Sequence, residues 1–131
     1  MKRLVYILVI ISLMVGLVGI TGCAGSGVPS ATFTITSWYE DSDGFVDICF
    51  DVENTGNVDI AYYEVYFQVN YLGGSYRKMD NGVNVKAGTK VSDETAFDAG
   101  YKEVTNIEVA DWELSTETGL TWNAAGERTN H

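Results

Sequence analysis

The chain lacks the side chains on which most enzyme chemistry depends. Its only histidine, His131, is the last residue, so a Ser-His-Asp or Cys-His arrangement has no candidate base. A histidine-ligated zinc or copper site is unsupported for the same reason, and no Walker-type glycine loop occurs. The sequence therefore predicts a protein that is not an enzyme and has no cofactor. An envelope enzyme that works through carboxylates alone is the remaining catalytic alternative.

Basic residues are also scarce. The 131 residues contain 8 Lys and Arg against 18 Asp and Glu, a formal net charge of -10. Two of the basic residues, Lys2 and Arg3, belong to an apolar leader, so the rest of the chain is more acidic still. This negative charge repels nucleic acid phosphates and anionic lipid head groups. We therefore expect no nucleic acid partner.

The first 22 residues have the pattern of a secretory signal peptide, with a positive start before an apolar run from Leu4 to Ile20. The run ends in Ile20-Thr21-Gly22-Cys23, which resembles the lipobox of prokaryotic lipoproteins at all four positions. The resemblance implies that residues 1–22 are removed and that Cys23 carries a thioether-linked lipid. An uncleaved anchor helix is the alternative. Both interpretations tether the chain to a cell membrane or an outer membrane, facing the extracytoplasmic side.

The remaining chain divides into three segments. Small residues and the only proline, Pro29, predict a flexible spacer over residues 23–31. Over residues 32–114, alternating apolar and polar residues between glycine-containing turns predict an all-β fold, an antiparallel β-sandwich of about seven strands. Residues 115–131 lack periodicity and predict a mobile C-terminal tail, with Leu120 and Trp122 as residues that could dock on the domain.

Two alternating runs around the turn Asn54-Thr55-Gly56-Asn57 give the clearest strand pair, with inward stripes from Val46 to Val52 and from Ala61 to Tyr71. Later strands are less regular. Asp80-Asn81-Gly82 predicts a break between two short strands. The last strand, residues 104–114, changes its inward parity, which predicts a bulge near Ala110 or Asp111.

From Val46 to Leu114 the chain resembles the immunoglobulin-like domains of the FxLYD type found in many prokaryotic lipoproteins. The resemblance is carried by Val52 to Gly56, by Val65 to Tyr71 with the following glycines, and by Ala87-Gly88 before Phe97. In the naming motif, Val69, Asn70 and Tyr71 replace Leu, Tyr and Asp. The resemblance implies an immunoglobulin-like fold and an extracytoplasmic interaction module, and it implies no catalytic residues.

Asp41, Asp43 and Asp47 form the one candidate metal site, because oxygen ligands at alternate positions resemble the start of a calcium loop. The twelfth position of such a loop is Val52 rather than glutamate, so we favour a solvated turn and expect no bound metal. Cys49 has no partner if Cys23 is lipidated, and we interpret it as an inert small residue.

Outward-facing aromatic residues form the candidate binding surface: Tyr62 and Tyr66, with Trp38, Tyr71 or Tyr76 as further members. Such side chains stack on sugars or anchor protein partners, although cross-strand packing that stiffens the sheet is the simpler interpretation. The sequence thus predicts a lipid-anchored, non-catalytic binding or structural module of the cell envelope. Its partner would be an envelope protein or a glycan, and a carbohydrate-binding protein is the main alternative.

Overall fold

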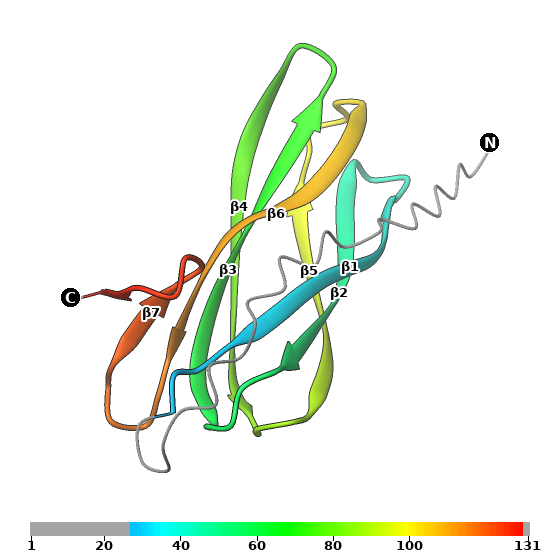
Figure 1. The fold of residues 1–131 in the computed structure, drawn as a ribbon. Helices are drawn as coiled ribbons and strands as arrows, with labels where there is room; N and C mark the ends of the chain where they lie inside the picture. Colours follow the sequence, from blue (N-terminus) through cyan, green and yellow to red (C-terminus); the bar gives the residue numbers. More distant parts are fainter. Residues whose placement is uncertain (1–26, 130–131) are drawn as a thin grey trace.

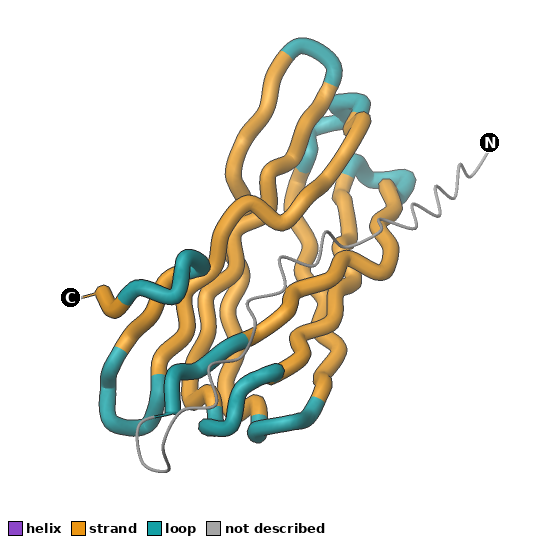
Figure 2. Tube along the Cα trace, in the orientation of Figure 1, coloured by secondary structure: helices purple, strands orange, loops and turns teal. Residues whose placement is uncertain are grey.

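The computed structural model describes residues 27–129, so the predicted signal peptide and residues 23–26 of the predicted spacer, including Cys23, lie outside the described residues. Strands and turns make up this part of the chain, and no helix occurs in it (Figure 2). Accordingly, residues 27–129 contain no helix long and apolar enough to cross a membrane. The strands are β1 (Ala31–Glu40), β2 (Phe45–Asn54), β3 (Ile60–Tyr71), β4 (Gly74–Val85), β5 (Lys90–Asp98), β6 (Val104–Ser115), β7 (Thr121–Asn123) and β8 (Arg128–Thr129).

The strands form two antiparallel sheets that pack face to face as a β-sandwich (Figure 1). One sheet has the order β1-β2-β5 and the other has the order β4-β3-β6-β7-β8. In an immunoglobulin-like sandwich, the first, second and fifth strands face a sheet built on the third, sixth and seventh. The chain has this order, with β4 added beside β3. The predicted fold class is therefore confirmed.

The core lies between the sheets and is built mainly from the inward stripes that the alternation predicts, although Ile60 is buried at the start of β3 in place of the predicted Ala61, and Tyr71 is only partly buried. Alternate residues of β2, from Val46 to Val52, are 0% exposed, and those of β3, from Tyr63 to Val69, are at most 1% exposed. The rings of Phe50 and Phe67 meet edge to face across the core, with their centroids 5.1 Å apart. Each buried aromatic or aliphatic side chain of this kind contributes about 1.5 to 3 kcal/mol.

A bulge in β1 reverses the face on which its later residues lie. The pairing with β2 passes from Ile35 to Ser37, so Thr36 is the extra residue. Its hydroxyl donates to the Cys49 carbonyl at 3.1 Å. As a result Trp38, predicted to face outward, points into the core and is only 6% exposed. The bulge predicted in the last strand is also present: Ala110 of β6 is skipped between the partners of Tyr66 and Phe67.

The predicted break at residues 80–82 is wrong, because β4 continues without interruption. Gly82 lies opposite Tyr63 of β3, and a Cβ atom built on Gly82 would overlap the phenol ring of Tyr63. Glycine at this position therefore gives room for an aromatic ring rather than forming a turn. It lets Tyr63 extend over β4 toward the other sheet.

Asn54, predicted as a turn residue, ties together four parts of one end of the sandwich. Its side chain is 0% exposed, and its amide nitrogen donates to the carbonyls of Val58 and Val85, both at 2.9 Å. Its side-chain oxygen accepts from the Gly56 amide at 3.0 Å. Its own backbone groups pair with the loop after β4, at Gly88 and Thr89. All the polar atoms of this buried side chain are therefore used.

The C-terminal segment, expected to be a mobile tail, contains two short strands in the structure. β7 pairs with the end of β6, and β8 pairs with β7. Trp122 is 9% exposed, as expected for a docked side chain. Trp122 and Leu120 line a groove of about 800 Å³ beside the first described residues, Gly27 and Val28. This pairing explains why the sequence did not predict the two strands. β7 has only three residues, too few to show an alternating pattern, and it depends on β6 for its hydrogen bonds.

Candidate functional site

The candidate site is the outward surface of β3, where two tyrosines converge on one carboxylate. The Tyr62 hydroxyl donates to Oε1 of Glu64 at 3.0 Å, and the Tyr66 hydroxyl donates to Oε2 at 2.8 Å. The three residues alternate along β3, so strand geometry places them all on the same face. We call Tyr62, Glu64 and Tyr66 with their outward neighbours on β4 and β6 the tyrosine face.

The two tyrosines compensate an unfavourable charge pair. Glu64 lies directly opposite Glu113 of β6, and like charges in this arrangement destabilise a sheet. Two hydroxyl donors to Glu64 offset that repulsion and hold both rings in place. The pKa of Tyr66 is raised chiefly because its hydroxyl donates to Glu64. The pKa of Tyr62 is raised first by burial and second by its own hydrogen bond to Glu64. Both tyrosines therefore stay protonated donors at neutral pH.

Neighbouring strands add an ion pair and aliphatic side chains to the tyrosine face. Arg77 of β4 lies over the Tyr66 ring, 4.6 Å from its centroid, and pairs with Asp111 of β6 at 3.3 Å. Met79 and Val83 of β4 are 42% and 62% exposed. The result is a mixed surface of aromatic, aliphatic and charged groups, which is the composition typical of protein-binding patches.

The other predicted aromatic members lie elsewhere. Trp38 is buried in the opposite sheet, so it is no part of the tyrosine face. Tyr71 packs against Lys102, whose Nζ is 4.6 Å from the ring centroid. Tyr76 lies edge to face with Phe97 at 5.2 Å, and burial raises its pKa to about 12. Of the five predicted aromatics, only Tyr62 and Tyr66 lie on the tyrosine face; Tyr71 and Tyr76 form a separate ring contact, with centroids 6.4 Å apart.

The three aspartates of the weak calcium candidate have different roles in the structure. Asp41 caps the turn between β1 and β2, since its Oδ1 accepts from the amides of Asp43 and Phe45 at 2.9 and 3.0 Å. Asp43 is exposed in the turn, whereas Asp47 lies within β2 opposite Tyr39. Within residues 27–129 no group of three His, Cys, Asp or Glu side chains could hold a metal ion.

Sequence reasoning missed a second polar cluster, at the open edge between β4 and β5. The Tyr63 hydroxyl reaches across from one sheet and donates to Oδ2 of Asp93 on the other at 2.8 Å. Asp80 of β4 also faces this space. Its pKa is raised, first by burial and then by the negative charge of Asp93, while Lys78 and a hydrogen bond to Thr95 act in the opposite direction. Inward-facing charges on edge strands protect them from pairing with other chains.

We expect Asp80→Asn to stabilise the protein at neutral pH. A carboxyl whose pKa is raised by folding destabilises the fold once it ionises, so the wild type loses stability as the pH rises through that pKa. The gain should be less than about 1 kcal/mol because Asp80 is partly exposed. Thermal melts of both chains from pH 4 to pH 8 test this. The curves should converge at the acid end, and a constant difference would show that the Asp80 charge is not the cause.

No family model matches this chain, and no curated protein matches it either. Its fold is therefore known from the structure, and its function has to be argued from the sites.

Proposed function

We propose that this protein is a membrane-anchored, extracytoplasmic lipoprotein that acts as a non-catalytic binding module of the cell envelope and uses the tyrosine face as its contact surface. The observation that carries the proposal is the pair of hydrogen bonds from Tyr62 and Tyr66 to Glu64. An FxLYD-type, immunoglobulin-like interaction module, which the sequence resembles, would have such a role.

The hydrogen bonds matter because they preorganise the aromatic groups. Binding normally costs about 0.5 to 1.5 kcal/mol for each flexible side chain that becomes immobilised. Tyr62 and Tyr66 are already held by Glu64, and Arg77 is held between Tyr66 and Asp111. Docking of a partner on this surface therefore costs little side-chain entropy. Tyr and Arg are also among the residue types that most often anchor interfaces.

The proposed lipid anchor rests on the lipobox-like sequence from Ile20 to Cys23, which lies outside the described residues. Mass spectrometry of the protein from membranes should find an N-terminal peptide that begins at Cys23 and carries a diacylglyceryl group. A peptide that includes residues 22 and 23 without modification would contradict the lipid anchor. The uncleaved anchor helix would then be the interpretation that remains.

A glycan is the second candidate partner. Two tyrosine rings on either side of a carboxylate offer apolar faces for sugar rings and an acceptor for sugar hydroxyls. The flat outward surface of a sheet suits an extended chain of sugars. Protein binding remains the first proposal because exposed Met79 and Val83 continue the surface with aliphatic groups that a sugar does not need.

Two assays with one set of variants separate the candidates. Tyr62→Ala/Tyr66→Ala should weaken binding by tenfold or more, which corresponds to about 1.4 kcal/mol or more. Loss of a glycan-array signal in this variant would select the carbohydrate function, and loss of a membrane complex from an affinity pulldown would select the protein partner. Tyr39→Ala is the matched control, because Tyr39 is 45% exposed on the opposite sheet. Equal binding by all three chains would refute the tyrosine face.

A further inference from the structure

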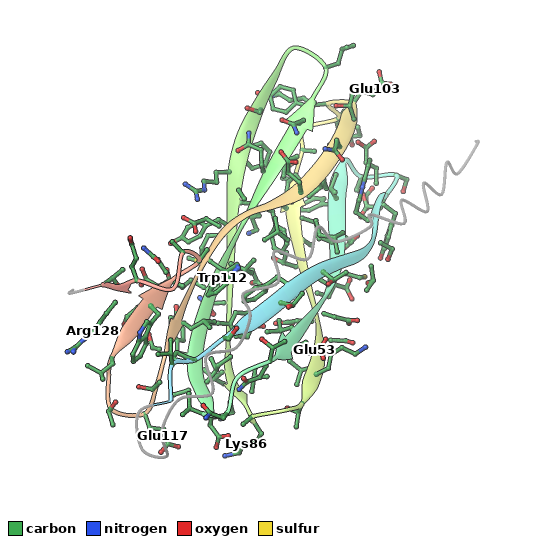
Figure 3. All side chains as sticks on the ribbon, in the orientation of Figure 1. Glu53, Lys86, Glu103, Trp112, Glu117 and Arg128 are labelled. Carbon is green, nitrogen blue, oxygen red and sulfur yellow. The ribbon has the colours of Figure 1, made fainter. Side chains whose placement is uncertain are left out.

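A second surface, separate from the tyrosine face, lies at the end of the sandwich opposite the first described residues. Three connections meet there: the β1–β2 turn, the β3–β4 turn and the β5–β6 loop (Figure 1). Figure 3 shows Glu103 at this end and Lys86 and Glu117 at the other. We call residues 41–45, 72–73 and 99–103 the tip. A strand of ten residues extends about 33 Å, so the two ends of the sandwich are far apart.

The tip exposes large apolar side chains. Tyr101 and Leu72 are 77% and 74% exposed, the highest values among the large hydrophobic residues that the structure describes, and Phe45 is 43% exposed. A folded protein leaves single apolar residues exposed without consequence, but three at one end are a feature of contact surfaces.

Backbone hydrogen bonds hold the three connections together. The Ala99 amide donates to the Gly44 carbonyl, and the Leu72 amide donates to the Glu103 carbonyl, both at 2.9 Å. The ring of Tyr101 lies against Gly44, where a Cβ atom would be 3.2 Å from two ring carbons. The apolar side chains are therefore presented from loops that are joined to one another, which lowers the entropic cost of binding.

The position of Tyr101 is strained. Gly100 and Tyr101 have φ values of 59° and 62°, and the Lys102 amide donates to the Ala99 carbonyl at 3.1 Å. Two consecutive positive φ values match a type I′ turn, in which glycine or asparagine is favoured at both central positions. A tyrosine in this conformation costs about 1 to 2 kcal/mol, and glycine would remove that cost. Strain of this kind occurs mostly at functional positions.

Carboxylates surround the apolar groups of the tip. The acidic residues on these connections and at the strand ends beside them are Glu40, Asp41, Asp43, Asp98 and Glu103. Lys102 is the one basic residue on the same segments, and it already lies over the ring of Tyr71. An anionic membrane surface or a second acidic copy of this chain would be repelled. The complementary partner has an apolar pocket bordered by lysine and arginine.

We propose that the tip is a docking surface for a protein with such a basic-rimmed apolar pocket, and that Tyr101 is its anchor. The tip shares no residue with the tyrosine face, so the chain has two contact surfaces. Where the N-terminus is lipid-anchored, which rests on the proposed function, the tip is the end that faces away from the membrane.

The test uses a random peptide library displayed on phage and selected on the full chain, immobilised in mild detergent. Peptides bound by the full chain should combine apolar residues with Lys or Arg. Tyr101→Gly should weaken their binding at least fivefold while melting at the same temperature or higher, because it removes the strained residue and keeps every charge. Asp43→Asn/Glu103→Gln should weaken binding at low salt.

Four results would overturn the proposal: no enrichment, enrichment of acidic peptides, self-association through Tyr101, or equal binding to the Tyr101→Gly chain. The comparison with the Tyr101→Gly chain is the decisive one, since any acidic protein attracts basic peptides without a specific site. The Tyr62→Ala/Tyr66→Ala chain should bind the selected peptides normally. A result that refutes peptide binding at the tip is therefore distinguishable from one that refutes the proposed function of the tyrosine face.

Discussion

Asn54→Ala should lower the free energy of unfolding by about 3 kcal/mol, because it leaves buried carbonyl groups without their donor. Nδ2 of Asn54 serves Val58 and Val85, and Oδ1 serves the Gly56 amide. These bonds connect the end of β2 to the start of β3 and to the end of β4. Urea unfolding followed by tryptophan fluorescence measures the loss as a lower midpoint with an unchanged slope.

Two further variants show whether the hydrogen bonds are the cause. Asn57→Ala changes an exposed residue of the same turn and should alter stability by no more than about 0.5 kcal/mol. Asn54→Asp keeps the size of the side chain but directs a carboxylate at two carbonyls, so it should be at least as harmful as alanine at neutral pH. A small effect of Asn54→Ala, similar to that of Asn57→Ala, would contradict the role assigned to Asn54.

Gly82→Ala should cost about 2 to 3 kcal/mol, at the upper end of the usual effect of overpacking. The added methyl group would overlap the ring of Tyr63, which is only 1% exposed. The hydroxyl of Tyr63 is also held by Asp93 on the other sheet at 2.8 Å. Displacing the ring would therefore also break the hydrogen bond that connects β3 of one sheet with β5 of the other.

A double-mutant cycle isolates this contact. In a chain that carries Tyr63→Ala, the added methyl of Gly82→Ala meets no ring, so the second substitution should cost less than about 1 kcal/mol. Chemical unfolding of the four chains gives the coupling energy. If Gly82→Ala costs the same in both backgrounds, the tyrosine ring is not the reason for glycine, and backbone conformation in β4 is the cause instead.

Much of the core could be predicted from the sequence because alternation alone determines it. Val46 to Val52 and Val65 to Val69 alternate without interruption, and their faces are set by strand geometry. Trp38 could not be placed in this way, since the single extra residue at Thr36 inverts every later position and has no local mark in the sequence. The bulge at Ala110 was predictable only because apolar residues on both sides of it are out of phase.

The candidate site was predictable in part for a similar reason. Tyr62 and Tyr66 share parity on a regular strand, so their common face follows from the sequence. That both donate to Glu64 depends on side-chain rotamers and on Glu113 of β6, which lies 49 positions further along the chain than Glu64. Gly82 resembled a turn residue in the sequence. The residue that requires glycine at this position is Tyr63, whose ring occupies the space of a Cβ atom and which is also distant in the sequence.

Photo-crosslinking in cells tests the central claim, that the tyrosine face is the contact surface of a membrane-anchored module. A photoreactive phenylalanine analogue replaces Met79, which is 42% exposed beside Tyr66, in the full-length chain with its own leader. The same analogue at Thr34, on the opposite sheet, is the control. We predict an adduct in the membrane fraction from position 79 that is lost with Tyr62→Ala/Tyr66→Ala. No adduct from position 79, or one equally strong from position 34, would contradict the account.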